Sequence, residues 1–82
     1  MTTILSIQRA TAEYFGVTVN DLKSGRVDKI TVRARHVAMF LCRHETTASL
    51  PKIGREFGNR DHTAVMYAIK KIDRELGCLK SS

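Results

Sequence analysis

The run Arg60-Asp61-His62-Thr63 places four side chains with hydrogen-bonding or methyl-packing chemistry in consecutive positions. An arginine can bind guanine through two hydrogen bonds, a carboxylate can accept one from cytosine N4, and a threonine methyl can pack on thymine. Such side chains contact base edges when they lie at the N-terminal end of a helix in the major groove. The residues alone leave an alternative open, in which Asp61 only caps a helix and His62 and Thr63 are solvated.

The segment before this run is predicted to be a short helix. Its apolar residues recur at i, i+3 and i+7, namely Leu50, Ile53 and Phe57. Ser49 can cap it, and Pro51 falls in the first turn, where its missing N–H has no partner in the helix. Gly58 and Asn59 both accept a left-handed backbone, so we expect the helix to end there.

A second helix is predicted to begin at Asp61, whose negative charge suits the positive end of a helix. Its apolar residues follow at intervals of four, three and four and should form one buried stripe: Val65, Ile69, Ile72 and Leu76. Gly77 is expected to end it. The segment from about residue 49 to 76 is therefore predicted to be a helix-turn-helix, a motif whose second helix presents its first residues to DNA.

The rest of the chain is predicted to form the scaffold that positions this motif. A helix is expected from about residue 3 to 15, with Tyr14 in the core. A capping box then begins a short helical turn over residues 18–23. Residues 23–32 show no period and are expected to form a loop, and the longest middle helix should span about residues 33–46. The fold class is thus all-α, a small bundle of about five helices.

The length, charge and apolar content of the chain limit which kinds of partner it can bind. The chain has 82 residues and is expected to be a single domain, 1–82, with a core from about 3 to 77. Its 14 basic and 8 acidic residues give a net charge of +6, which favours a polyanionic partner such as nucleic acid. The charge would also suit a membrane surface, but no basic amphipathic helix with bulky aromatic residues supports that partner. No apolar run reaches about 18 residues, so we expect no membrane span. The N-terminus lacks a signal-peptide pattern, so the expected location is cytoplasmic.

Several segments resemble one protein family. The run LPKIGREFGNRDHTAVMYAIKKI resembles the C-terminal DNA-binding domain (domain IV) of the bacterial chromosomal replication initiator DnaA, whose signature is close to SLPxIGxxFGGRDHTTVxHAxxKI. Upstream, RARHVAMFLCRHETTASLP is similar to the family's PRQxAMYLxRExTxxSLP, and AEYFGVTVNDLKS is similar to its first two helices. The resemblance spans about residues 4 to 76. It implies a Trp-repressor-like fold that binds double-stranded DNA sequence-specifically at DnaA-box-like sites, in replication initiation or transcription.

The resemblance also implies roles for individual residues. The major-groove contacts correspond to Arg60, Asp61, His62 and Thr63. Contacts to the DNA backbone, or support of the motif, correspond to Arg35, Arg43, Leu50, Pro51 and Ala64. In the signature, Asn59 replaces a glycine and Ala64 replaces a threonine, so one hydroxyl contact is lost.

A basic loop of the family enters the minor groove, where arginine suits a narrow A/T-rich groove. Arg26 is the residue that we expect in this role, with Lys29 beside it. The family loop is commonly SKRRxR or SKKRxK, whereas this chain has Ser24-Gly25-Arg26-Val27-Asp28-Lys29, with fewer bases and one acid. A cluster of charges on a loop is otherwise most often solvated surface.

The sequence does not predict an enzyme. It contains no Walker phosphate loop, no HExxH pattern and no nucleophile elbow. We expect no cofactor, no small-molecule substrate and no metal site, since Cys42 and His44 alone supply too few ligands for zinc. Cys42 lies on an apolar stripe and is predicted to be a buried free thiol.

Other questions stay open at this point. The alternative function is a protein-interaction module, or a competitor or modulator of the initiator, with weak nonspecific DNA binding. Replication proteins are conceivable partners. We expect a monomer, because no apolar stripe is left over for a dimer interface. The sequence leaves open whether the protein is free-standing or the C-terminal domain of a longer initiator.

Overall fold

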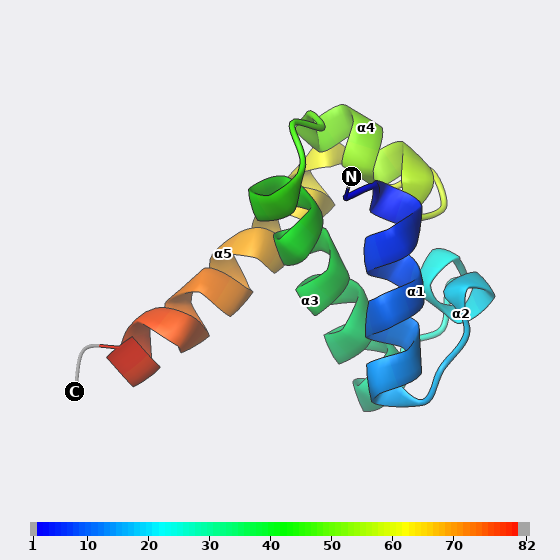
Figure 1. Cartoon of the computed structure of the whole chain (residues 1–82), viewed down its shortest axis with the longest axis horizontal. Coiled ribbons are helices and arrows are strands. Elements are labelled where there is room, and N and C mark those ends of the chain that lie inside the picture. Colours follow the sequence, from blue (N-terminus) through cyan, green and yellow to red (C-terminus); the bar gives the residue numbers. More distant parts are fainter. Residues whose placement is uncertain (1, 81–82) are drawn as a thin grey trace.

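Five α-helices make up the regular structure in residues 2–80, which are the residues that the computed structural model describes, with side chains as far as Gly77. They are α1 (Ile4–Phe15), α2 (Val19–Lys23), α3 (Lys29–Glu45), α4 (Leu50–Glu56) and α5 (His62–Lys80). The predicted all-α bundle of five helices is confirmed (Figure 1). None of these described helices is both long enough and apolar enough to span a bilayer.

The helix ends follow short-range capping. The Thr3 hydroxyl accepts a hydrogen bond from the Ser6 N–H at 3.1 Å, and the Ser6 hydroxyl accepts one from the Thr3 N–H at 3.1 Å. Thr18 and Asp21 form the predicted capping box in front of α2. Gly16 ends α1 with a φ of 72°, a left-handed conformation that glycine adopts without a steric cost. Local side chains therefore determine where the first two helices begin.

The prediction that the third helix begins at Arg33 is wrong. The helix α3 begins four residues earlier, at Lys29, because Asp28 caps it. The Asp28 carboxylate accepts the Thr31 N–H at 3.1 Å and the Thr31 hydroxyl at 2.9 Å. The spacing of apolar residues did not predict this first turn, because a polar residue, Asp28, determines where the helix begins. The loop between α2 and α3 is consequently short, and Lys29 belongs to the helix.

The core forms around α3, which lies between α1 and α5 in Figure 1. Small buried residues line α3 at intervals of four: Ala34, Ala38 and Cys42. Leu22, Phe57 and Val65 bring α2, the end of α4 and α5 into the same cluster. Cys42 is the predicted buried free thiol, and burial raises the pKa of its thiol to about 12. The core thus joins all the helices directly to the helix-turn-helix.

The expectation that Tyr14 lies in the core is wrong, because its side chain is 84% exposed. The buried face of α1 includes Gln8, whose side-chain amide donates to the Glu56 carbonyl at 2.9 Å. Phe15, seven residues after Gln8, lies on the same side of α1 and packs against the core, whereas Tyr14 does not.

The final helix is longer than predicted. Gly77 does not end it, because α5 continues to Lys80 and the backbone of Gly77 is not left-handed. Val65 and Ile72 of the predicted stripe are buried, whereas Leu76 is exposed. Figure 1 shows the C-terminal part of α5 extending away from the other helices.

The turn between α4 and α5 packs against the end of α2. Gly58 and Asn59 adopt the predicted left-handed backbone, with φ values of 87° and 58°. A Cβ atom on Gly58 would lie 2.2 Å from the Lys23 carbonyl oxygen, and one on Gly54 would lie 2.2 Å from the Arg60 carbonyl oxygen. Both positions therefore require glycine. The Gly54 contact holds the turn against α4, and the Gly58 contact packs the turn on the end of α2.

Gly58→Ala should lower the free energy of unfolding by at least about 2 kcal/mol, because it combines a positive φ with a backbone clash. The matched control is Gly77→Ala. Gly77 lies in an exposed part of a helix with open space at its Cβ position, so alanine should stabilise the fold by about 0.5–1 kcal/mol. Urea denaturation measures both values. Equal effects of the two substitutions would contradict the packing described for the turn.

Candidate nucleic-acid interface

Three of the four predicted major-groove residues lie exposed at the start of α5: Asp61, His62 and Thr63. Asp61 precedes the helix, and its carbonyl accepts the Val65 N–H at 3.3 Å. Its carboxylate lies 2.9 Å from His62 Nδ1 and 3.5 Å from the Thr63 backbone nitrogen. Asp61 therefore has the geometry of a helix cap and at the same time orients the imidazole next to it.

Arg60 does not point into solvent with the other three. Its Nη2 donates to the Ser24 carbonyl at 2.6 Å, across the junction between the turn and the α2–α3 loop. Its Nε is buried without a hydrogen-bond partner. The side chain is half-buried, so the guanidinium in this structure does not offer the open two-donor edge that guanine would require.

Arg35 differs most from its predicted place. We expected it on a polar face near the DNA backbone, yet its side chain is only 5% exposed. Its guanidinium donates to the carbonyls of Leu22 at 3.0 Å, Ser24 at 3.0 Å and Arg26 at 2.9 Å. Burial, and then the positive charge of Arg60, lower the pKa of Arg35. Helical spacing did not predict this role, because the acceptors are backbone carbonyls at the end of α2 and in the following loop, which no side-chain pattern reveals.

The basic loop presents Arg26 at the surface, but in ion pairs. Its Nε lies 3.0 Å from the Asp28 carboxylate, and its Nη1 lies 3.4 Å from that of Asp21. The pKa of each carboxyl is lowered, mainly by backbone N–H donors from Thr31 and Thr18 respectively and further by Arg26. Lys29 is exposed at the first position of α3 rather than within the loop that was predicted to hold it.

The remaining predicted residues lie along α3, α4 and α5. Arg43 is exposed, and its Nη1 donates to the Ala48 carbonyl at 3.3 Å. Pro51 is exposed in the first turn of α4, while Leu50 is half-buried against the core. Ala64 is exposed in the first turn of α5.

Two residues that the sequence did not identify border the same area. A groove of about 410 Å³ between α3 and α5 is lined by Arg60, Thr63 and Ala64, and also by His36 and Tyr67. Tyr67 is four residues after Thr63, so its place on the exposed face of the second helix was available from helical spacing. Partial burial, followed by the charge of Lys71, lowers the pKa of His36.

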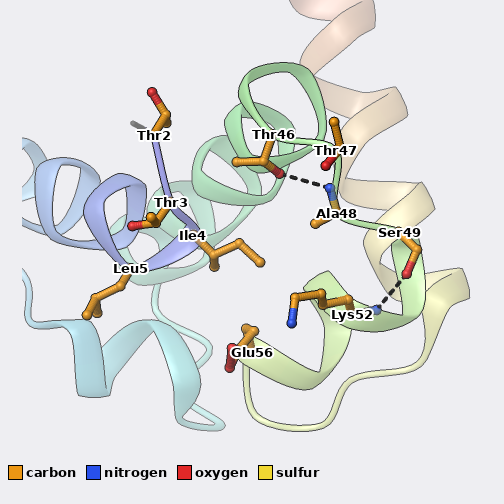
Figure 2. Close-up of a pocket in the computed structure, with 10 residues that line it drawn as sticks. All are labelled: Thr2, Thr3, Ile4, Leu5, Thr46, Thr47, Ala48, Ser49, Lys52 and Glu56. Atoms are coloured by element: carbon orange, nitrogen blue, oxygen red, sulfur yellow. Dashed lines mark hydrogen bonds between the residues drawn. The ribbon is translucent and has the colours of Figure 1, made fainter.

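A larger hollow lies elsewhere on the bundle. It has a volume of about 660 Å³ and is formed by the start of α1, the 46–49 connection and α4. Figure 2 shows mainly hydroxyl and aliphatic side chains around it, with Lys52 and Glu56 as the charged residues. The Ala48 N–H donates to the Thr46 hydroxyl, and the Lys52 N–H donates to the Ser49 hydroxyl. None of the predicted DNA-contacting residues lines this hollow.

Most of the chain is similar to part of the bacterial DnaA proteins. The family model described as the bacterial dnaA protein helix-turn-helix matches residues 4–72. The chromosomal replication initiator proteins DnaA of Leifsonia xyli subsp. xyli (strain CTCB07) and Clavibacter sepedonicus are each 58% identical to this chain over 62 residues. That of Caulobacter vibrioides (strain NA1000 / CB15N) is 49% identical over 71 residues.

These matches cover 76% and 87% of this chain respectively. They cover only 13% and 14% of the relatives' own lengths, so the chain spans a small part of the proteins that it matches. The similarity therefore concerns one segment of those proteins and not their activities as a whole.

His36 generates a prediction about pH. Its pKa in the folded state lies below the unfolded value of about 6.5, so the unfolded chain binds the proton more readily. The free energy of unfolding should therefore decrease as the pH is lowered from about 7.5 to 5.5, because the unfolded chain takes up the proton first. His36→Gln should reduce this fall, which thermal denaturation at the two pH values measures. An identical fall in the variant would contradict the assignment to His36.

Proposed function

The chain belongs to the bacterial DnaA helix-turn-helix family, and we propose that it binds double-stranded DNA sequence-specifically at DnaA-box-like sites. The observation that carries this proposal is the exposed first turn of α5, where Asp61, His62 and Thr63 stand side by side. The N-terminal residues of the second helix of such a motif contact base edges in the major groove. The resemblance to the DnaA signature supports the same site, because it assigns the major-groove contacts to residues 60–63.

The loop of residues 24–28 is the proposed minor-groove element, with Arg26 as its contact. Arg26 is held by Asp21 and Asp28, and these pairs are exposed, so each contributes little stability. A phosphate-lined groove can compete for the guanidinium against such pairs. Lys29 follows at the start of α3 and adds positive charge beside the loop.

Other residues support these contacts. Arg43 is exposed and is proposed to contact a phosphate, which adds affinity without sequence information. Pro51 and Leu50 form the start of α4, and Ala64 adds only a methyl group beside the base-contacting turn. Arg35 is buried and therefore positions the loop rather than contacting DNA.

For Arg60 the structure favours a positioning role over the predicted contact with guanine. Its hydrogen bond to Ser24 links the turn that precedes α5 to the loop that precedes α3. Arg60 would thereby hold the major-groove and minor-groove elements at a defined separation. Losing it should disturb both elements without removing any particular base preference.

The biological setting that we propose is the control of replication initiation or transcription at such sites. The relatives are named as chromosomal replication initiator proteins, and the matched part is their helix-turn-helix, not an ATPase module. Within this proposal the chain acts as a monomer in the cytoplasm. A protein-interaction role with weak nonspecific DNA binding is the alternative, and it would appear as equal binding to any duplex.

His62→Ala should abolish most discrimination between a DnaA-box duplex and a scrambled duplex of equal composition. Fluorescence anisotropy at two salt concentrations measures this, and the unchanged protein should prefer the box by at least about tenfold at both. His44→Ala, at an exposed histidine near the end of α3, should keep the full preference. Equal, salt-erased binding of the unchanged protein to both duplexes would refute the proposed specificity.

The role of Arg60 is tested with duplexes in which guanine is replaced by 7-deazaguanine, which removes the N7 acceptor. If Arg60 acts only by positioning, the replacement should change the affinity of the unchanged protein and of Arg60→Ala by the same factor. If Arg60 binds guanine, only the unchanged protein should lose affinity. Anisotropy titrations on matched duplexes distinguish the two outcomes, with Arg9→Ala on α1 as a charge-matched control.

A further inference from the structure

Tyr67 is a large aromatic residue at the surface with neighbours on both α3 and α5. Its side chain is 60% exposed. The edge of its ring meets the ring of His36 from α3, with centroids 6.0 Å apart and an angle of 77° between the planes. The Lys71 ammonium lies 6.0 Å from the centre of the Tyr67 ring. The ring is therefore oriented by neighbours from two helices without being part of the core.

Tyr67 lies between two hollows along α5. On one side is the groove that contains Thr63 and Ala64 at the proposed base-contacting turn. On the other is a shallow hollow of about 290 Å³ formed by Tyr67, Lys70, Lys71 and Arg74. Since Tyr67 follows Thr63 by four residues, it lies about 6 Å further along the same face of the helix.

The charges around Tyr67 favour an anionic ligand. The second hollow is lined by three cations and the phenol, with no carboxylate among its lining residues. His36, which contacts the ring, is near the charges of Lys71, Arg35 and Arg33, of which Arg33 is ion-paired with Glu75. A helix that carries its first turn into the major groove brings its later turns toward the sugar-phosphate backbone.

We infer that Tyr67 is an additional DNA-contacting residue, whose phenol hydroxyl donates a hydrogen bond to a phosphate oxygen of the bound duplex. This inference rests on the proposed function, because it requires a duplex seated on the first turn of α5. Lys70, Lys71 and Arg74 attract the strand, and the neutral phenol supplies a directional donor. A hydrogen bond to a charged acceptor is stronger than one between neutral groups, so a single hydroxyl has a measurable effect.

The test compares Tyr67→Phe, which removes only the hydroxyl, with the unchanged protein on a DnaA-box duplex and on a scrambled duplex. Tyr67→Phe should weaken binding by about 3- to 10-fold on both, as expected for a lost hydrogen bond to a phosphate. The salt dependence of binding should stay the same, because no charge is removed. Arg74→Gln should reduce that salt dependence by about one counterion. Tyr14→Phe, at the exposed tyrosine of α1, should have no effect.

A scan of the box duplex with single neutral methylphosphonate linkages locates the acceptor. One linkage should weaken the unchanged protein and leave Tyr67→Phe unaffected. Affinity of Tyr67→Phe equal to that of the unchanged protein would overturn the inference. So would a loss seen only with Tyr67→Ala and only at a thymine, since the ring would then be packing on a base. Equal binding of the unchanged protein to both duplexes would refute the proposed specificity, while the Tyr67→Phe ratio on either duplex would still decide the role of the hydroxyl.

Discussion

The carbonyl oxygen of Ser24 accepts hydrogen bonds from two arginines that are far apart in the sequence, Arg35 at 3.0 Å and Arg60 at 2.6 Å. Through this one acceptor, the middle helix and the turn of the helix-turn-helix are both attached to the α2–α3 loop. Gly58 completes the junction, because only a residue without a Cβ can approach the Lys23 carbonyl so closely. The two proposed DNA-contacting elements therefore have a defined spacing before DNA is present, which lowers the ordering cost of binding.

Bringing two guanidinium groups to one carbonyl has an electrostatic cost. Neither Arg35 nor Arg60 is paired with a carboxylate at this junction, and the charge of Arg60 contributes to the lowered pKa of Arg35. The acids nearby are used elsewhere, since Asp21 and Asp28 cap helices and hold Arg26. The charge of Asp28 acts in the opposite direction on Arg35, so the cost of bringing the two guanidinium groups together is partly offset.

The packing of α3 makes this arrangement compatible with a small core. Ala34, Ala38 and Cys42 are short side chains on one buried face, which allows neighbouring helices to approach closely. From the same helix, Arg35 reaches the loop and His36 reaches Tyr67 on α5. One helix therefore supports the core, the loop and the groove beside the proposed base-contacting turn. A change in the position of α3 would alter all three together.

The helices, their caps and the left-handed turn could be predicted from the sequence, because they depend on residues that are close together in the chain. The five helices, the caps at Thr3 and Thr18 and the left-handed pair Gly58 and Asn59 follow from short-range hydrogen bonds and steric preferences. The family and the helix-turn-helix were recognisable for the same reason, since their signature is a local run of residues.

Which polar side chains are free to contact a ligand depends on how the helices pack together. Arg35 and Arg60 were expected at the surface, but both donate to the Ser24 carbonyl, a contact that helical spacing cannot reveal. Tyr14 was expected in the core, but α1 buries Gln8, which donates to the Glu56 carbonyl, and leaves Tyr14 exposed. Helical spacing indicates that Tyr67 lies on the exposed face of α5, but it does not indicate the contact of Tyr67 with His36 from α3. In each case the outcome depends on partners distant in the sequence, and residue periodicity carries no information about them.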